Sequence, residues 1–282
     1  MNLVNRIALF LIRSKFTILS AISKKKAAQS AFRLFCTPPV RHTGKVISPF
    51  TEADQVTLAF REYSIRGFVW NKGAQKRALI VHGFQSSVLN FGMYVQPLIS
   101  QGYEVLAFDA PAHGGSSGQR INALLFRDFI LFITRTYGPI NAYIAHSFGG
   151  LAVSLAITTE LPAADARLVL LAPATETTRA IEHFFAMVKL KDPAVQREFE
   201  QIITEIGGHP SSWFSVARAV ETMNIPVLWV HDKDDAITPI ADVEPVIQTN
   251  QPHIQFMITE GLGHRRIYRD HSVINRVIQF LS

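Results

Sequence analysis

The sequence predicts an α/β fold with a mostly parallel central sheet that is flanked by helices. Short apolar runs recur along the chain, among them "ALIVHG", "EVLAFD", "LVLLAP" and "PVLWVHD". Continuous runs of this kind are typical of strands that are buried on both faces of a parallel sheet. Helical patterns lie between the runs, and this alternation indicates a doubly wound arrangement. With 282 residues, 48% of them hydrophobic, the chain can bury a core of that size.

Eight strands are expected, and the first two form an antiparallel entry to the sheet. The expected strands are residues 56–63, 65–70, 78–82, 104–108, 142–145, 167–171, 226–231 and 254–259. Helices that cover the sheet are expected at residues 89–100, 123–136, 148–159 and 266–281.

One connection is too long for a single crossover helix. About fifty residues, 175–224, separate "LVLLAPA" from "IPVLWVHD", whereas a crossover helix needs about a dozen. The stretch carries three amphipathic helical patterns, and we expect a small helical cap there, above the carboxyl ends of the strands. Ordinary peripheral helices are the alternative. Four apolar residues are candidates for an acyl pocket or, as we favour, for plain core: Phe184, Phe185, Met187 and Trp213.

Charged residues are distributed unevenly along the chain. The net charge is +6, yet residues 1–51 hold nine Lys and Arg residues and no acid, which leaves 19 basic against 22 acidic residues elsewhere. A mildly acidic body disfavours a nucleic-acid partner. Residues 38–50 contain three prolines and are typical of a connector. We therefore expect a basic arm with its connector at residues 1–50, and one domain at 51–282 with its cap at about 175–224.

The arm, "MNLVNRIALFLIRSKFTILSAISKKK", leaves three alternatives open. Its longest apolar run is Ile7–Ile12, which is too short to span a bilayer, and no secretory cleavage site follows promptly. On a helical projection Arg6, Arg13 and Lys24 fall on one narrow basic stripe among Leu, Ile and Phe residues. Residues 1–26 therefore form a helix that contacts a membrane surface, a helix packed on the body, or an organelle-targeting segment.

Cysteine and acid usage bear on the compartment and on metal binding. The single cysteine, Cys36, cannot form an internal disulfide, so we expect a cytoplasmic location, with the arm as the route to any membrane association. The stretch "HDKDD" carries three acids in four residues, which cannot all converge on one ion. The sequence has neither a His-x-x-x-His motif nor a Cys pair, so we expect no metal and no other cofactor.

The stretch "NAYIAHSFGGLAVSLAI" contains a serine at a sharp turn between an apolar strand and a helix. At such a turn the residues two before and two after the serine must be small, because strand and helix approach closely. Ala145 and Gly149 meet that requirement. Ser147 is either a nucleophile or a plain turn residue, and we favour the nucleophile because suitable partners follow it in the chain.

A serine hydroxyl needs a base within hydrogen-bond reach, and the base needs an acid to orient it. "GLGHRR" places His264 between a Gly-rich turn and the last helix, where it is the candidate base. "VLWVHDKDDAITP" places two acids after a strand. We favour Asp234 as the acid, with Asp235 as its rival and Glu176 as an outside candidate.

An oxyanion hole needs two N–H donors beside the nucleophile. The expected donors are the backbone N–H groups of Phe148 and Phe84, the latter next to a turn at Gly83. We expect His82 to brace this loop, and His113 and His146 to line or support the site.

Five stretches resemble, in order and spacing, the motifs of the serine hydrolases of the α/β-hydrolase fold. "LIVHGF" resembles the oxyanion turn, and "VLAFDAPAHGGSSG" matches at Asp109 and Gly114. "AHSFGG" resembles the nucleophile elbow, with Ala145 at its first glycine. "VHDKDDAITP" is similar to the acid loop His-Gly-x-x-Asp-x-x-x-Pro, taken with Asp234 as the acid and Asp232 at the glycine, and "GLGHRR" resembles the histidine turn. The resemblance spans residues 55–282.

The resemblance implies an esterase- or lipase-like enzyme that cleaves carboxylic esters through an acyl-enzyme intermediate and uses no cofactor. Ser147, His264 and Asp234 would form its triad, and Phe84 and Phe148 its oxyanion hole. A small-molecule ester with an apolar acyl part is the implied substrate. Thioesterase or peptidase activity with the same triad, and a non-catalytic ligand-binding role, are the alternatives. A serine at position 147 disfavours dehalogenase and epoxide-hydrolase chemistry, which would need an aspartate there.

Overall fold

The computed structural model describes residues 3–282, and the side chains from Arg6 onward. The chain forms two compact units. One joins the residues up to Thr37 with Glu176–Phe214, and the other joins Pro38–Thr175 with Ser215–Ser282. The N-terminal arm is thus grouped with the inserted segment, and the sheet lies entirely in the second unit.

The second unit is built on one eight-stranded sheet with the order β1-β2-β4-β3-β5-β6-β7-β8. The strands are β1 (Asp54–Phe60), β2 (Tyr63–Trp70), β3 (Lys76–Val81), β4 (Tyr103–Phe108), β5 (Ala142–His146), β6 (Arg167–Leu171), β7 (Val227–Asp232) and β8 (Ile254–Thr259). β1 pairs with β2 and β2 with β4 in antiparallel fashion, and all other pairs are parallel. The predicted mostly parallel sheet with its antiparallel entry is confirmed.

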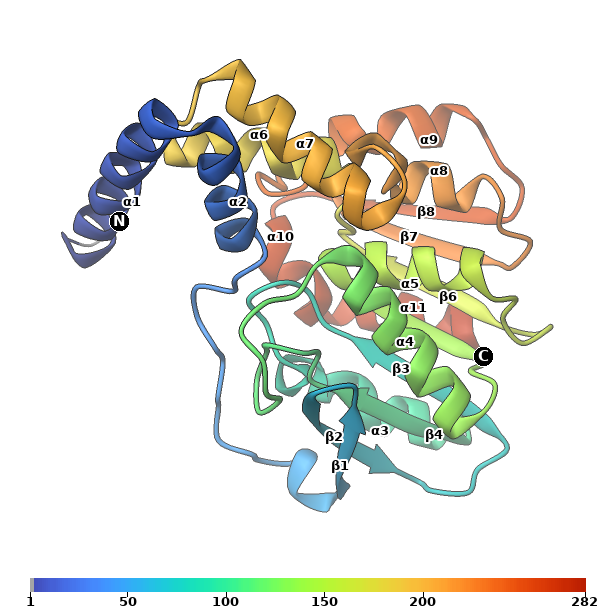
Figure 1. Cartoon of the computed structure of the whole chain (residues 1–282). Coiled ribbons are helices and arrows are strands. Elements are labelled where there is room, and N and C mark those ends of the chain that lie inside the picture. Colours follow the sequence, from blue (N-terminus) through green and yellow to red (C-terminus); the bar gives the residue numbers. More distant parts are fainter. Residues whose placement is uncertain (1–2) are drawn as a thin grey trace. The chain divides into compact units, whose positions relative to one another are not determined.

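Helices cover both faces of this sheet (Figure 1). On one face lie α3 (Gly92–Ser100) and α11 (His271–Leu281), and on the other lie α4 (Ala123–Tyr137), α5 (Phe148–Thr159) and α8 (Val216–Val220). The short helices α9 (Glu244–Gln248) and α10 (Gly263–Arg266) follow β7 and β8. Single 3₁₀ turns are formed by Phe50–Glu52, Val88–Phe91, Ser211–Trp213, Ile240–Asp242 and Ile267–Arg269.

Two-sided coverage explains why the central strands are apolar throughout. In β4 and β5 every residue is buried, so alternating side chains enter the two cores. Ile80 and Ile144 pack in the core that contains the α3 and α11 side chains. Burial of each such side chain contributes about 1.5–3 kcal/mol, which makes this sheet the stable platform for the loops at its edge.

The described residues of the first unit form four α-helices and the 3₁₀ turn Ser211–Trp213. The α-helices are α1 (Leu3–Ile22), α2 (Lys24–Phe35), α6 (Thr177–Val188) and α7 (Pro193–Gly207). Ser23 caps α2 by accepting the N–H of Lys26. Asp192 caps α7 by accepting the N–H of Ala194, and Gly208 ends that helix with a φ of 71°. Among the described residues, no helix is both long and apolar enough to cross a membrane.

Phe199 of α7 organises the hydrophobic core of this unit. Its ring packs edge-on against the rings of Phe32 and Phe35 from α2, and it contacts Phe184 and Phe185 from α6. Three fully buried alanines of α2 leave room for this approach: Ala27, Ala28 and Ala31. Phe184 and Phe185 are therefore core residues of the unit, which is the alternative that the sequence favoured for them.

Candidate active site

Ser147 occupies the turn between β5 and α5 with φ 54° and ψ −124°, a backbone conformation that costs energy for any residue but glycine. The surrounding backbone holds it there. The Ser147 N–H donates to the carbonyl of Leu171 (3.1 Å), and its own carbonyl accepts the N–H of Ala174 (3.0 Å) and of Gly150 (2.9 Å). The hydroxyl is thereby fixed at the carboxyl end of the central strand.

Close approach of neighbouring backbone explains the small residues around this turn. A Cβ added at Gly149 would lie 2.5 Å from the carbonyl oxygen of His82, and one added at Gly83 would lie 2.8 Å from the Cβ of Ser147. Both positions therefore need glycine. Ala145 is fully buried within β5, where the sheet accommodates its methyl group.

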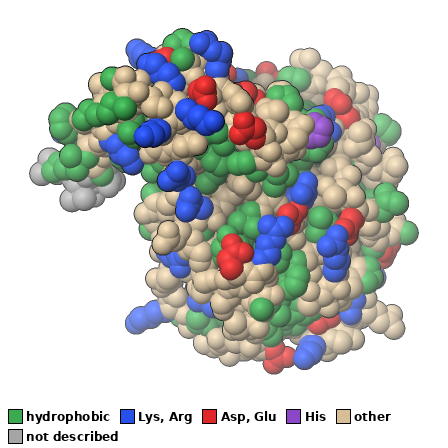
Figure 2. All heavy atoms as spheres, viewed as in Figure 1, with side chains coloured by type: hydrophobic (Ala, Val, Ile, Leu, Met, Phe, Trp, Pro, Cys, Tyr) green, Lys and Arg blue, Asp and Glu red, His purple; other side chains and the backbone are tan. Residues whose placement is uncertain are grey.

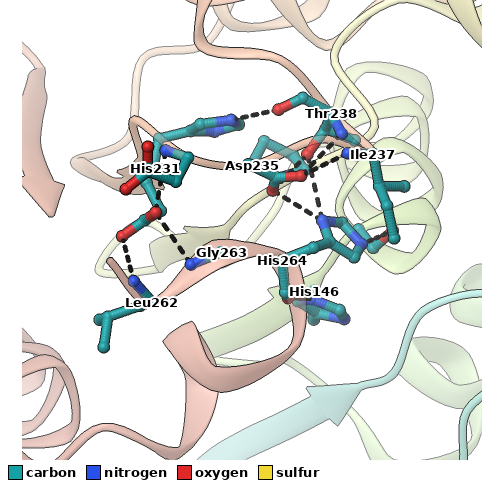
Figure 3. Close-up of polar contacts among 12 residues, drawn as sticks. His146, His231, Asp235, Ile237, Thr238, Leu262, Gly263 and His264 are labelled. Atoms are coloured by element: carbon teal, nitrogen blue, oxygen red, sulfur yellow. Dashed lines mark hydrogen bonds and ion pairs between the residues drawn. The ribbon is translucent and has the colours of Figure 1, made fainter. Parts of the chain in front are cut away.

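His264, in α10, bridges two residues from other loops (Figure 3). Its Nε2 lies 3.0 Å from the Oγ of Ser147, and its Nδ1 lies 2.7 Å from Oδ2 of Asp235. An ionised carboxylate only accepts hydrogen bonds, so Nδ1 carries the proton and Nε2 is free to accept the serine O–H. All three residues are at most 9% exposed, which shields this chain of hydrogen bonds from water.

The acid at His264 is Asp235, and the sequence assignment of Asp234 is corrected by this geometry. The Asp234 side chain is exposed, and its Oδ2 accepts the N–H of Gly261 at 2.8 Å. Asp235 is instead held by three groups of its own loop. Its Oδ1 accepts the N–H groups of Ile237 (2.8 Å) and Thr238 (2.9 Å), and its Oδ2 accepts the Thr238 hydroxyl (2.8 Å). Only Asp235 is turned toward His264.

The spacing of the acid-loop motif also identifies Asp235 as the acid. In the pattern His-Gly-x-x-Asp-x-x-x-Pro, the acid stands four residues after the histidine and four before the proline. His231 and Pro239 both place Asp235 at that position. The alignment that takes Asp234 as the acid is therefore wrong by one residue.

Hydrogen bonding keeps Asp235 ionised. Burial raises the pKa of its carboxyl, but the hydrogen bond and charge of His264 and the N–H groups of Thr238 and Ile237 outweigh burial and lower the pKa to about 2. A carboxylate that stays charged can stabilise positive charge on the imidazole when His264 takes up a proton.

Asp232 joins the acid loop to the histidine loop, and it stands where the family pattern has a glycine. Its fully buried carboxylate accepts four hydrogen bonds, from the N–H groups of Asp234, Leu262 and Gly263 and from the hydroxyl of Thr259. Burial raises the pKa of the Asp232 carboxyl, but the four hydrogen bonds lower it by more. The pKa therefore lies below its usual value. Each of the three acids in "HDKDD" therefore has its own hydrogen-bonding role.

His82 fixes the loop that carries Phe84. The N–H of Ala110 donates to His82 Nε2 (3.0 Å), so Nδ1 carries the proton and donates to the carbonyl of Gly83 (2.8 Å). The carbonyl of Gly83 and the N–H of Phe84 belong to one trans peptide and point in opposite directions. His82 thereby sets the direction of the Phe84 N–H. The rings of Phe84 and Phe148 meet edge to face at 5.9 Å, which brings both donor segments together beside Ser147.

Three further histidines are buried around these loops, and all are held neutral. His113 Nε2 accepts the N–H of Gln85 (3.2 Å). His146 contacts the carbonyl of His264 through Nε2 (3.0 Å), and His231 contacts the carbonyl of Thr238 through Nε2 (2.7 Å). Burial lowers the pKa of His113 and of His146 to about 3, and it lowers that of His231 and His82 as well. These rings support the site as neutral hydrogen-bonding groups, a role that a single sequence cannot distinguish from lining the site.

Asp109 anchors the segment after the oxyanion loop from a fully buried position. It accepts from the Ser87 hydroxyl and from the N–H groups of Val88 and Gly115, and it pairs with the Arg66 guanidinium at 2.5 Å. A Cβ at Gly114 would lie 2.2 Å from this carboxylate, so glycine is required there. The predicted match at Asp109 and Gly114 thus marks a structural support of the site.

Comparison with known proteins agrees with the fold described above. The family described as "Serine aminopeptidase, S33" matches residues 73–204. No curated protein sequence matches the chain. The fold is similar to that of an esterase from Pyrococcus furiosus, with a TM-score of 0.62 and 19% identity over 87% of this chain and 97% of that one.

Two further solved structures share the fold. A monoacylglycerol lipase from Paleococcus ferrophilus has a TM-score of 0.58 and 20% identity over 77% of this chain and 98% of the other. The thioesterase domain from the curacin biosynthetic pathway has a TM-score of 0.59 and 15% identity over 81% and 98%. The sheet order and these likenesses show that the chain has the α/β-hydrolase fold, and the family match over residues 73–204 agrees with the resemblance to serine hydrolases that the motifs carry.

Proposed function

We propose that this protein hydrolyses carboxylic esters through an acyl-enzyme intermediate, with Ser147 as nucleophile, His264 as general base and Asp235 as the orienting acid. The observation that carries the proposal is the buried chain of hydrogen bonds from Ser147 Oγ through His264 to Asp235. A neutral imidazole with its proton on Nδ1 is the form that can accept the serine proton at Nε2.

In the first half-reaction the Ser147 proton moves to His264 Nε2 while Oγ bonds to the carbonyl carbon of the ester. The carbonyl oxygen becomes an oxyanion. When this intermediate collapses, the bond to the leaving alkoxide breaks and the alkoxide takes the proton from His264. In the second half-reaction a water molecule gives a proton to His264 and its oxygen attacks the acyl carbon. Collapse returns the proton to Ser147 and releases the carboxylic acid.

The oxyanion would accept from the backbone N–H groups of Phe84 and Phe148. Phe148 is the first residue of α5, so its N–H lies at the positive end of the helix dipole. The direction of the Phe84 N–H follows from the His82–Gly83 hydrogen bond. Preorganised donors of this kind typically contribute about 10²–10³ to kcat each.

The proposed substrates are small esters with an apolar acyl part. Ester cleavage is favoured because two of the similar structures are named as an esterase and a monoacylglycerol lipase. Amide cleavage is the second candidate because the matching family is described as a serine aminopeptidase, and thioester cleavage uses the same acyl chemistry. A cytoplasmic location, expected because Cys36 is the single cysteine of the sequence, stays a prediction.

The test is hydrolysis of p-nitrophenyl esters from acetyl to palmitoyl, beside an acyl thioester and an amino-acid p-nitroanilide. We expect turnover of at least one ester, loss of turnover in Ser147→Ala, and slower cleavage of the anilide. Faster cleavage of the anilide or the thioester would replace the ester proposal with the corresponding alternative. A folded protein that cleaves none of these compounds would contradict the catalytic proposal and favour a ligand-binding role.

A further inference from the structure

Helix α1 exposes an apolar face although it already buries another. Phe16 is 2% exposed and faces the interior of its unit. Five large apolar side chains of the same helix are exposed: Ile7 (52%), Phe10 (67%), Leu11 (61%), Ile18 (61%) and Ile22 (70%). A soluble helix normally shows polar side chains on its outer side, so this surface needs an explanation.

These five side chains lie on one side of the helix, with partly exposed Ser14 between Leu11 and Ile18. At about 100° per residue they fall within an arc of roughly 120°, and the middle of that arc lies opposite Phe16. From Ile7 to Ile22 the strip is about 22 Å long at 1.5 Å per residue. We call it the outer strip of α1.

Positive charge borders the outer strip on both sides. Exposed Arg6 lies next to Phe10 on the helical projection, and exposed Lys15 lies next to Ile22 on the other side. Residues 1–51 contain no acid. Figure 2 shows hydrophobic side chains interspersed with Lys and Arg side chains over the region of α1 and α2.

Two other basic residues of the arm form contacts within the first unit. Arg13 donates to the carbonyl of Met187 through Nη2 (2.8 Å), and Lys24 pairs with Asp192 at 2.5 Å. The basic stripe expected from the sequence is thus partly committed to contacts within the first unit. Arg6 and Lys15, beside the outer strip, are the charges that frame the apolar surface.

We propose that the outer strip of α1 binds the surface of an anionic lipid bilayer. The apolar side chains would enter the boundary between headgroups and acyl chains, and Arg6 and Lys15 would reach the anionic headgroups. Exposed Lys25 and Lys26 at the start of α2 add to the attraction. A second copy of the helix fits less well, because it would bring the Arg6 and Lys15 side chains of both copies to one rim with no acid from the arm to balance them.

This inference does not rest on the proposed ester chemistry, since it uses only residues of α1 and α2. The test is flotation of the 282-residue chain with phosphatidylcholine vesicles that contain about a third phosphatidylserine, and with pure phosphatidylcholine vesicles. We expect binding to the anionic vesicles, weaker binding to the neutral ones, and release as the salt concentration is raised.

Variants assign the binding to the outer strip. The double variant Phe10→Ser, Ile18→Ser should lower binding to anionic vesicles by about tenfold or more. The double variant Arg6→Gln, Lys15→Gln should also lower it by about tenfold and should weaken its salt dependence. Ile206→Ser is the matched control, because Ile206 is an isoleucine of α7 in the same unit and is 49% exposed. It should bind as the wild type does.

Turnover of a water-soluble ester separates this proposal from the previous one. The Phe10→Ser, Ile18→Ser variant should keep wild-type turnover and wild-type thermal unfolding while losing vesicle binding. The proposal is overturned if the wild type does not float with anionic vesicles, or if Ile206→Ser weakens binding as much as the strip variants. It is also overturned if sedimentation without lipid shows a dimer that the strip variant abolishes, since the strip would then be an interface between copies.

Discussion

Oδ2 of Asp235 lies 2.7 Å from Nδ1 of His264, while the adjacent carboxylate of Asp234 accepts a hydrogen bond from the N–H of Gly261. Two neighbouring acids of one loop thus have different roles. Asp235 is buried and directs the imidazole, whereas Asp234 is exposed and joins its loop to the turn before His264. The pair offers a matched test of the site.

Asp235→Asn should lower kcat for an ester by about 10³–10⁴, because an amide neither stabilises the imidazolium nor enforces the proton on Nδ1. Asp234→Asn should retain kcat within a few fold, because an asparagine oxygen can still accept the N–H of Gly261. Steady-state kinetics of both variants decide the matter. A large loss in Asp234→Asn with little loss in Asp235→Asn would contradict the assignment.

His82 offers a test of how the oxyanion loop is held. His82→Ala should lower kcat by about 10² with little change in KM, because the Gly83 carbonyl loses its donor and the Phe84 N–H loses its direction. His82→Asn places an amide N–H near the former Nδ1 and should recover part of the loss. If both variants fold, by circular dichroism, and turn over at the wild-type rate, His82 does not position the loop.

The sheet and most of the site could be predicted from the sequence, because continuous apolar runs and a serine between a strand and a helix depend on local pattern. Asp234 and Asp235 lie in one loop, and the spacing of the motif from His231 and Pro239 already points to Asp235. The hydrogen bonds from the N–H groups of Ile237 and Thr238 show that the Asp235 side chain turns inward, which spacing alone does not establish. The protonation state of the histidines also depends on burial among distant segments, which no local pattern contains.

The packing of the N-terminal arm also depends on residues that are distant in the sequence. Its amphipathic character was evident, but which face packs depends on α6 and α7, which come more than 150 residues later in the chain. The projection alone suggested a free basic stripe. Contacts of Arg13 with Met187 and of Lys24 with Asp192 show that part of this stripe is used within the first unit.

Stability should fall as the pH drops below about 6.5. In the folded protein the pKa values of His113 and His146 are about 3, so the unfolded chain binds more protons between pH 6.5 and 3. The free energy of unfolding therefore decreases as the pH falls, by about 2 kcal/mol per histidine between pH 7 and 5. Protonation of Asp235, whose pKa is lowered to about 2, reduces the free energy of unfolding only below about pH 3.8. Urea unfolding at pH 7, 6 and 5 measures this slope.

His113→Gln provides the control for that slope. Its side-chain oxygen can still accept the N–H of Gln85, but the side chain does not titrate. The loss of unfolding free energy between pH 7 and 5 should shrink by about 2 kcal/mol in this variant. An unchanged slope would mean that His113 is protonated alike in the folded and unfolded states.

The small residues of the serine turn should differ in their tolerance. Gly149→Ala should cost about 3 kcal/mol of unfolding free energy or more, because its Cβ would meet the carbonyl of His82 at 2.5 Å. Ala145→Gly should cost about 1 kcal/mol and leave kcat within a few fold, since it only removes a methyl from a strand. Chemical denaturation and ester kinetics measure both. A large rise in kcat in Ala145→Gly would show that the methyl hinders the turn.

The most direct test of the account is the reaction of the folded protein with a fluorophosphonate, followed by peptide mass spectrometry. This reagent phosphonylates only a serine that is activated by a base. We expect one adduct, on Ser147, and strongly reduced labelling in His264→Ala and Asp235→Asn but not in Asp234→Asn. A folded protein that stays unlabelled at Ser147, or that is labelled on another serine, would contradict the claim that Ser147 is the nucleophile.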